Sequence, residues 1–446
     1  MGRLFGTDGI RGVAGVELTP EMAFRVGRVG AYVLAQKSGR PPQFLVARDT
    51  RISGPLLEAA LVAGLASVGA TVYIAGIIST PAAAYLTKLS GSCGGVMISA
   101  SHNHYSDNGF KFFNAEGFKL SDESEEEIER LYFLPEDNLP RPTAEHIGRI
   151  YPFVDAEERY LEFLLSTVSQ RFDGYHVVLD CANGAAYRLA QHVFRALGAE
   201  VTAIHATPDG LNINRECGST SHQEVARAVR ESGADLGFAF DGDADRVLAV
   251  DERGELVDGD AIMAVYACYL KKQGRLRHDT VVATVMSNLG LDKAADAAGF
   301  HVLRTKVGDR YVLEEMLAGG YNLGGEQSGH IILLDYSTTG DGLLAALQLM
   351  SVVAAGRPLS ALAGLMKHYP QVLVNCRVGR RDGLEANERI RLAVAETEQA
   401  LAGRGRLLVR SSGTEPLVRV MLEGPDEAEL HIMANSLVNV IQEELG

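Results

Sequence analysis

The sequence lacks any apolar run long enough to cross a membrane. A membrane-spanning helix needs roughly 20 mainly apolar residues, and no stretch of this kind occurs in the 446 residues. The opening segment, MGRLFGTDGIRG, also lacks the apolar core of a secretory signal. We therefore expect a protein that is not bound to a membrane.

Cysteine is scarce and scattered. The five cysteines are odd in number, are widely spaced and form no CxxC pair; they are Cys93, Cys181, Cys217, Cys268 and Cys376. This pattern argues against a disulfide framework and against a cysteine-rich zinc site. Because disulfides are uncommon in reducing compartments, it favours a cytoplasmic protein.

Nucleotide-binding signatures and an excess of basic residues are also missing. Neither GxxxxGK[ST] nor GxGxxG occurs, so nucleotide binding has no positive signal. The formal net charge is -15, whereas a protein that binds nucleic acid needs a basic face. We expect no nucleic acid partner. A small anionic substrate is compatible with this charge, because a few arginines can hold it inside an acidic protein.

Helix-like and strand-like segments alternate from end to end, which indicates α/β architecture. A stretch rich in proline and charge, LPEDNLPRPTAEHIG, marks one boundary. We predict three similar α/β domains followed by a smaller α+β domain, at residues 1–150, 151–255, 256–368 and 369–446. The acidic run from Asp122 to Glu129 is expected to be the solvated face of a helix.

Three aspartates alternate in the segment DGDADR, which lies between two strand-like runs. Alternate residues of an extended chain share a face, so Asp241, Asp243 and Asp245 would point to one place and repel one another without a cation. Oxygen ligands favour magnesium, with calcium and manganese as alternatives. An EF-hand is rejected because Arg246 stands where that loop needs glycine. A plain polar hairpin is the other interpretation.

Ser101 and His102 follow the apolar run GVMIS, at the point where a strand should end. The segment ISASHN lacks the glycines of a hydrolase nucleophile elbow, and it could also be an ordinary polar turn. A phosphate on Ser101 would add hard oxygen ligands to a metal held by the aspartates. Lys111 and His102 are candidate proton carriers for such a site.

Two further loops carry groups suited to a sugar phosphate. In GGEQSGH, the side chains of Glu326, Ser328 and His330 alternate and can face one side. In RSSGTEPLVR, hydroxyls and glycine amides can form a nest for phosphate oxygens, to which Arg410 and Arg419 add charged donors. Each loop alone could be a glycine-rich or polar turn.

Together and in this order, the loops resemble those of the α-D-phosphohexomutase family over essentially the whole chain. The matching segments are FGTDGIRG, ISASHN, DGDADR, VGDRYV, GEQSGH and RSSGTEP. Within the family they look most like the bacterial branch that acts on glucosamine phosphates. The resemblance implies four domains around a central active-site cleft, a magnesium ion and a sugar-phosphate substrate, with the chain acting as a monomer or a homodimer.

The resemblance also implies a role for each loop. Ser101 would be a phosphoserine and would hold magnesium together with the three aspartates of DGDADR. By the same resemblance, the site of transfer is lined by Arg11, Lys111 and Arg246, with His102 as the candidate proton carrier named above. The sugar phosphate would be bound by Glu326 and Ser328, with His330 nearby, and by Arg410, Ser412, Gly413, Thr414 and Arg419.

The implied reaction interconverts glucosamine 6-phosphate and glucosamine 1-phosphate, through the phosphoserine and a bound glucosamine 1,6-bisphosphate. It would feed the synthesis of UDP-N-acetylglucosamine and of cell-wall precursors. Inside the family, the alternative is a phosphoglucomutase or phosphomannomutase. Outside it, the alternatives are a phosphatase that uses the aspartates directly, without need of Ser101, and a sugar-phosphate-binding protein without catalysis.

Overall fold

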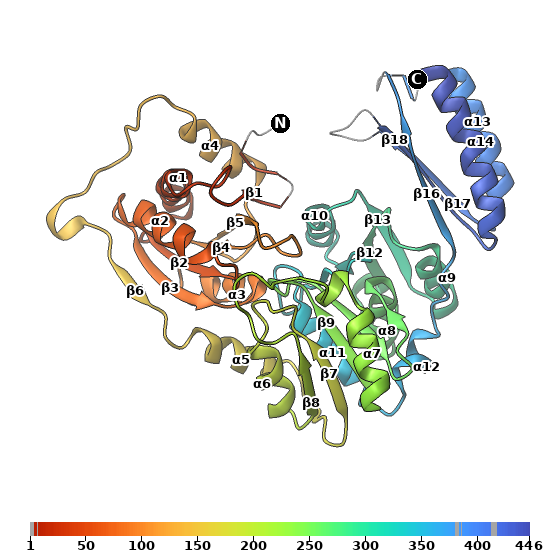
Figure 1. The fold of residues 1–446 in the computed structure, drawn as a ribbon, viewed down its shortest axis with the longest axis horizontal. Coiled ribbons are helices and arrows are strands. Elements are labelled where there is room, and N and C mark those ends of the chain that lie inside the picture. The colour runs from red at the N-terminus through yellow and green to blue at the C-terminus, as the bar shows by residue number, and fades with distance from the viewer. Residues whose placement is uncertain (1–3, 7, 380–382, 385, 412–416) are drawn as a thin grey trace. The chain divides into compact units, whose positions relative to one another are not determined.

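The computed structural model describes residues 4–6, 8–379, 383–384, 386–411 and 417–446 (Figure 1). Its internal contacts define two compact units. The larger comprises Met1–Val285 and Val302–Leu365, and the smaller comprises Met286–His301 and Met366–Gly446.

The first sheet of the larger unit is six-stranded and mixed. Its strand order is β1 (Ile10–Val13), β5 (Asp107–Asn114), β4 (Gly94–Ile98), β2 (Gln43–Arg48), β3 (Thr71–Ile77) and β6 (Ile150–Pro152). β2 pairs in parallel with β3 and β4, whereas β5 is antiparallel to both β4 and β1. The helices of this region are α1 (Pro20–Ser38), α2 (Gly54–Ala66), α3 (Thr80–Leu89) and α4 (Asp122–Tyr132).

The second sheet has five strands. Their order is β11 (Leu256–Val257), β10 (Val247–Asp251), β9 (Leu236–Phe240), β7 (His176–Asp180) and β8 (Glu200–Ile204). β7 pairs in parallel with β8 and β9, and β10 returns antiparallel to β9. Its helices are α5 (Ala156–Ser166), α6 (Leu189–Ala196) and α7 (Gln223–Ser232).

The third sheet has the order β13 (His301–Thr305), β12 (Thr280–Thr284), β14 (Leu323–Gly325) and β15 (Ile331–Leu333). Its helices are α8 (Gly259–Lys272), α10 (Asp309–Gly319), α11 (Gly342–Val353) and α12 (Leu359–Ala363). Every residue of α11 is buried. This helix contacts strands of both the second and the third sheet, so its apolar surface, which extends all round, forms a shared core between them.

The smaller unit is an antiparallel sheet covered by helices. β18 (Leu417–Glu423) lies between β16 (Gln371–Arg377) and β17 (Arg406–Ser411). α13 (Glu388–Leu401) and α14 (Glu427–Leu445) bury apolar side chains against these strands. Contacts also place α9 (Leu289–Ala298) in this unit.

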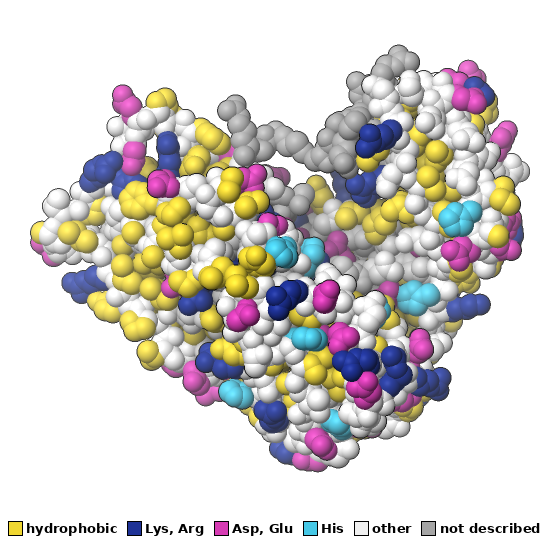
Figure 2. Space-filling view, in the orientation of Figure 1, with side chains coloured by type: hydrophobic (Ala, Val, Ile, Leu, Met, Phe, Trp, Pro, Cys, Tyr) yellow, Lys and Arg dark blue, Asp and Glu magenta, His cyan; other side chains and the backbone are white. Residues whose placement is uncertain are grey.

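The predicted fold class is confirmed: three mixed α/β sheets precede a smaller antiparallel α+β region. The domain boundaries stay predictions, because the contacts separate only two units. No helix among the described residues has the length and apolarity that a membrane span requires. Figure 2 shows acidic and basic side chains interspersed over the face that it displays.

Candidate active site

Ser101 lies in the loop between β4 and β5. All of β4 is buried, and burial continues to Ser101, which is 1% exposed. Its φ of 52° is in the left-handed region, which is unfavourable for a non-glycine residue and recurs in functional loops. The N–H of Ser101 donates to Ser99 Oγ at 2.9 Å. The hydroxyl is therefore held in a defined, strained position at the end of a strand.

The loop of residues 241–246 reaches Ser101 from the second sheet. It joins the antiparallel neighbours β9 and β10, so a buried strand pair fixes both of its ends. Ser101 Oγ donates to Asp241 Oδ2 at 2.5 Å. Gly242 permits the approach, because a Cβ at that position would lie 2.6 Å from the Ser101 carbonyl oxygen. The fold thus joins two segments that are 140 residues apart in the chain.

The three aspartates of this loop converge. One carboxylate oxygen from each of Asp241, Asp243 and Asp245 lies within 4.8 Å of the others, and all three residues are buried. Burial, together with the charges of Asp245 and Asp243, raises the pKa of Asp241 well above its usual value. Lys111 Nζ, from β5, donates to Asp243 Oδ2 at 2.8 Å and to Asp245 Oδ2 at 2.9 Å. One lysine does not balance three carboxylates, so the cluster favours a further cation.

Two oxygens of this cluster are left without a hydrogen bond. Asp243 Oδ1 and Asp245 Oδ1 are buried and accept none from the part of the chain that the structure describes. An unsatisfied buried oxygen of this kind is costly, and a bound cation would satisfy both. Because the donors are all carboxylate oxygens, they suit a hard divalent ion. The residues present therefore fit a metal site.

Arg11 and Asp8 border Lys111. Arg11, on β1, forms an ion pair with Asp8, whose Oδ2 is also 3.5 Å from Lys111 Nζ. Burial would raise the pKa of Asp8, but the charges of Lys111, Lys119 and Arg11 hold it well below its usual value. Asp8 was not singled out from the sequence, although it stands within FGTDGIRG.

His102 lies between Ser101 and Arg246. Its Nδ1 is 3.3 Å from Ser101 Oγ and accepts a hydrogen bond from Arg246 Nη1 at 3.0 Å. Burial and the positive charges of Arg246 and Arg11 lower the pKa of His102 to about 4. The ring is therefore neutral near pH 7, and its Nδ1 lies beside the serine while it accepts from Arg246.

The sugar-loop residues are not arranged as alternation predicts. Residues 326–329 form a turn between β14 and β15. Ser328 is exposed, whereas His330 is buried, with Nδ1 3.7 Å from Asp245 Oδ1 and Nε2 3.3 Å from Asp309 Oδ2. The expectation of one shared face is wrong because the turn interrupts the strand geometry. His330 instead lies beside the metal loop.

Asp309 and Lys119 connect the third sheet region with the first. Lys119 Nζ donates to Asp309 Oδ2 and to Asp8 Oδ1, both at 2.5 Å. Glu326 Oε1 accepts the N–H of Gly308, next to Asp309, at 3.1 Å. The segment VGDRYV therefore contacts both the sugar loop and the first sheet region. The segment VGDRYV was among those that carry the family resemblance, whereas nothing in the sequence pointed to Lys119.

Arg51 is a further residue that the sequence did not reveal. It is 1% exposed, and its Nε donates to Asp49 Oδ2 at 2.9 Å. Its other nitrogens donate to backbone carbonyls of the serine loop, those of Ser101, Asn103, His104 and Asp107. One guanidinium thus fixes the backbone on both sides of His102.

The predicted phosphate loop belongs to the smaller unit. Arg410 on β17 and Arg419 on β18 are direct antiparallel partners, so their side chains leave the sheet on the same face. Burial and the neighbouring charge of Arg419 lower the pKa of Arg410. Two adjacent guanidiniums favour an anion between them. The other three predicted members of this loop, Ser412, Gly413 and Thr414, lie outside the described residues.

Three mixed sheets that bring a serine loop beside an aspartate cluster form a site suited to phosphoryl transfer. Four family models of phosphoglucomutase/phosphomannomutase match the chain. They are the α/β/α domain I at residues 2–138, domain II at 158–254, domain III at 258–369 and the C-terminal domain at 373–440. The chain belongs to the phosphoglucomutase/phosphomannomutase family.

Within this family, full-length relatives carry the name phosphoglucosamine mutase. The protein from Brevibacillus brevis is 55% identical over 447 residues, with 100% of both chains covered. The protein from Moorella thermoacetica is 58% identical, with 97% of this chain and 98% of that protein covered. The Bacillus subtilis protein is 54% identical over 447 residues, again with 100% of both covered.

Solved structures share the fold. A phosphoglucomutase/phosphomannomutase family protein from Burkholderia thailandensis aligns with a TM-score of 0.82 at 24% identity, covering 98% of this chain and 96% of that one. An N-acetylphosphoglucosamine mutase from Aspergillus fumigatus, solved with GlcNAc-6P and magnesium, aligns with a TM-score of 0.72 at 18% identity, covering 100% and 96%.

Proposed function

We propose that this chain is a phosphoglucosamine mutase, which interconverts glucosamine 6-phosphate and glucosamine 1-phosphate. Relatives of that name span the whole chain at 53 to 58% identity. The observation that carries the proposal is the contact of Ser101 Oγ with Asp241, inside a buried cluster of three aspartates. The product would enter the synthesis of UDP-N-acetylglucosamine and of cell-wall precursors.

The reaction uses Ser101 as a phosphoserine. The phosphoryl group passes from Ser101 Oγ to a free hydroxyl of the sugar phosphate, giving bound glucosamine 1,6-bisphosphate. The sugar then turns round, and its other phosphate is transferred back to Ser101 Oγ. Each transfer forms one P–O bond and breaks one, and the hydroxyl proton moves to the oxygen that is released. The serine is therefore phosphorylated again at the end of each turnover.

Asp241, Asp243 and Asp245 would hold magnesium, together with an oxygen of the phosphoserine. When bound, the ion neutralises charge on the phosphoryl group, which is the main requirement of this chemistry. Lys111 adds a positive charge at Asp243 and Asp245. Arg11 and Arg246 supply guanidiniums, and neutral His102, which accepts from Arg246, lies next to Ser101 Oγ.

The residues that we assign to substrate binding form two sets. We assign Glu326 and Ser328 to the sugar hydroxyls, with His330 behind them against the metal loop. The phosphate that does not react is assigned to Arg410 and Arg419, which are strand partners, and to the neighbouring predicted residues Ser412, Gly413 and Thr414. This phosphate site must accept both ends of the sugar, because the bisphosphate turns round between the two transfers.

We take a single chain, as a monomer or within a homodimer, to be the catalytic unit, because the serine loop and metal loop that meet belong to one chain. All five cysteines are unpaired, which agrees with a reducing cytoplasm.

Comparison of substrates and a serine variant test this proposal. We expect kcat/KM to be about ten-fold or more higher for glucosamine phosphate than for glucose or mannose phosphate. Replacement Ser101→Ala should lower kcat by roughly 10³-fold or more, with circular dichroism unchanged. Equal efficiency on all three sugars would favour a phosphoglucomutase or phosphomannomutase. Full hydrolytic activity in the alanine variant would favour a phosphatase that uses the aspartates directly.

A further inference from the structure

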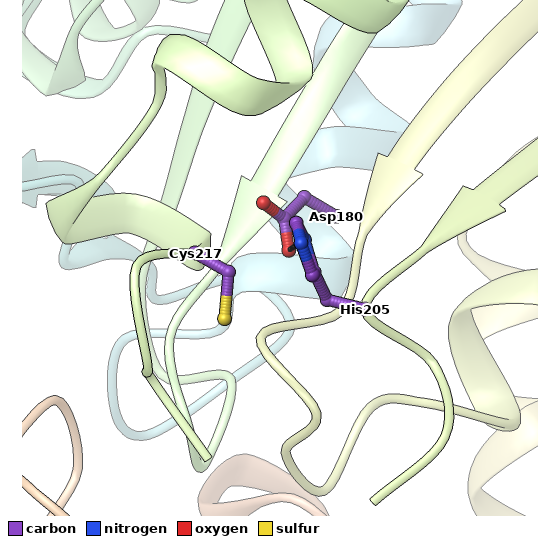
Figure 3. A group of neighbouring side chains, drawn as sticks. All are labelled: Asp180, His205 and Cys217. Carbon is purple, nitrogen blue, oxygen red and sulfur yellow. Dashed lines mark ion pairs between the residues drawn. The ribbon is translucent and has the colours of Figure 1, made fainter. Parts of the chain in front are cut away.

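A second cluster of potential metal ligands, made of residues other than the three aspartates, lies at the carboxyl ends of β7 and β8 in the second sheet (Figure 3). Asp180 is the last residue of β7, His205 follows β8 directly, and Cys217 precedes a short 3-10 turn. One oxygen, one nitrogen and one sulfur of these residues lie within 4.8 Å of one another. β7 and β8 are parallel neighbours, so their carboxyl ends bring Asp180 and His205 to the same edge.

The nitrogen of this cluster is buried and is paired with Asp180. His205 Nδ1 makes no hydrogen bond with any described residue, although it lies 3.1 Å from Asp180 Oδ1. Such a distance without hydrogen-bond alignment is an ion-pair contact. The Cys217 thiol beside it is free and fully buried. A nitrogen that is paired with Asp180 and a free thiol thus lie together with the carboxylate around one point.

The backbone around the cluster is held in unfavourable conformations. His205, Asn214 and Glu216 all have positive φ, at 47°, 57° and 54°. Positive φ is unfavourable for most non-glycine residues, and such strain concentrates at ligand clamps and functional loops. Asp180 fixes both sides of the cluster, since it accepts the N–H groups of Ala182 and Gly218 at 2.9 Å.

A catalytic role for the thiol is disfavoured. Burial and the charge of Asp180 raise the pKa of Cys217 to about 12, whereas a nucleophilic cysteine needs a thiolate that is accessible. The alternative, a plain ion pair between Asp180 and His205, would not explain why the Cys217 thiol lies next to both residues. A cation that takes up sulfur, nitrogen and oxygen together accounts for all three groups.

We propose that Asp180, His205 and Cys217 bind one zinc-like divalent cation, separate from the oxygen-only site at the aspartate loop. Thiolate and imidazole ligands select zinc over magnesium or calcium, and three protein ligands leave the fourth position of a tetrahedral zinc ion to water. Binding releases to solvent the thiol proton and the Nδ1 proton that His205 shares with Asp180. The charges then balance, because one carboxylate and one thiolate neutralise the divalent ion. This site could not be predicted from the sequence, because its ligands follow no CxxC spacing.

The cation would act on the serine loop through Asn214. This residue lies in the segment between His205 and Cys217, and its Nδ2 donates to the carbonyls of Ser101 and Asn103 at 2.8 and 3.1 Å. Fixing both ends of the segment limits the motion of Asn214. The site therefore has a structural role, in which it holds a loop that positions the serine.

Cobalt(II) can test the site, because its absorption spectrum depends on the kind of ligand that it binds. Wild-type protein is loaded with cobalt without oxygen and with excess magnesium, which fills the oxygen-only site. We expect one equivalent of cobalt with an intense thiolate charge-transfer band, which zinc abolishes by displacement. Oxygen ligands alone give no such band. A wild-type spectrum without the band would overturn the proposal, and this measurement requires no variant.

Two cysteine variants locate the ligand. In Cys217→Ser the band should disappear, and in the matched control Cys93→Ser, another buried free cysteine, it should remain at full intensity. Hydrogen exchange gives a separate readout: zinc should slow exchange of residues 206–217 in wild type and leave it unchanged in Cys217→Ser. A band that persists in Cys217→Ser, or exchange that zinc does not slow in wild type, would contradict the site.

Discussion

At the scale of single residues, the serine loop depends on one buried arginine. The guanidinium of Arg51 donates to four loop carbonyls and to Asp49. Lysine carries its charge and its three donors at one point, so it cannot reproduce this planar fork. Replacement of Arg51 by lysine should therefore displace Ser101 Oγ, even though the positive charge is kept.

We predict that Arg51→Lys lowers kcat by about 10–100-fold, because displacement of a reacting group by roughly 1 Å has an effect of that size. The measurement is steady-state kinetics, with phosphate on Ser101 determined by mass spectrometry. The matched control is Arg48→Lys in the same segment, where Arg48 pairs with Glu58 at 2.9 Å and does not contact the loop. Equal kcat values for the two variants would refute the role of Arg51.

The sequence predicted the residues that stand in distinctive loops, and it missed those whose partners are distant in the chain. Asp241, Asp243 and Asp245 could be grouped because their spacing alone brings them together. Lys119 and its partner Asp309 are 190 residues apart, so only the packing of the sheets reveals their contact. Arg51 was missed for the same reason.

At the scale of elements, α4 differs from the solvated helix that its acidic run suggested. Glu129 Oε1 accepts the N–H groups of Leu4 and Phe5 at 2.8 Å, and Glu125 lies 3.6 Å from Arg310 of α10. Only part of the run is exposed, so the prediction was partly wrong. Charge runs are usually solvated, but residues of this one, Glu125 and Glu129 among them, contact neighbouring segments, and local sequence does not show this.

Glu125 provides a prediction about pH. Burial, and then the charges of Asp122 and Glu129, raise its pKa from 4.5 to about 7 against the opposing effect of Arg310. The folded state thus binds the proton more tightly than the unfolded state. The resulting stabilisation is present below pH 4.5 and is lost as the pH rises through about 7.

The variant Glu125→Gln, which stays neutral, should therefore match wild type in thermal midpoint near pH 4.5 and exceed it above pH 7. The control is Glu123→Gln on the same helix, whose side chain is 86% exposed; it should follow wild type at each pH. Thermal unfolding over this pH range makes the comparison. A constant difference between Glu125→Gln and wild type would show that Glu125 does not titrate as described.

The alternation of helices and strands was sufficient to predict the fold class, but not the strand order. β1 pairs with β5, about a hundred residues later, with Ile10 opposite Phe110. Such long-range pairing depends on which apolar faces pack together, and a local pattern does not specify that. For the same reason, the sequence did not predict that α9 packs with the smaller unit.

At the scale of the whole molecule, the proposed chemistry draws on three sheets of the larger unit. Lys111 comes from the first sheet and Asp243 from the second, and they meet at 2.8 Å. His330, next to β15 of the third sheet, lies by Asp245. The smaller unit contributes a separate pair of guanidiniums. The proposal thus assigns phosphoryl transfer to one unit and phosphate binding to the other.

This division predicts distinct kinetic effects. Arg410→Gln should raise KM for the sugar phosphate by about 10–100-fold, since a hydrogen bond to a charged group contributes roughly 1.5–3 kcal/mol, and it should leave phosphate on Ser101 unchanged. The control Arg404→Gln removes an exposed arginine of the same unit that pairs with Glu429 at 3.0 Å. If Arg410→Gln and the control have the same KM, Arg410 does not bind the substrate.

The central claim is that Ser101 carries the phosphoryl group beside the aspartate cluster. Its most direct test is mass spectrometry of active protein, intact and after peptide mapping, before and after incubation in excess magnesium with an unphosphorylated sugar acceptor, which has no second phosphate to return to the serine. We expect one phosphate per active chain, located on Ser101 and lost to this acceptor. Fully active protein with no phosphate on Ser101, or with its phosphate on another residue, would contradict it.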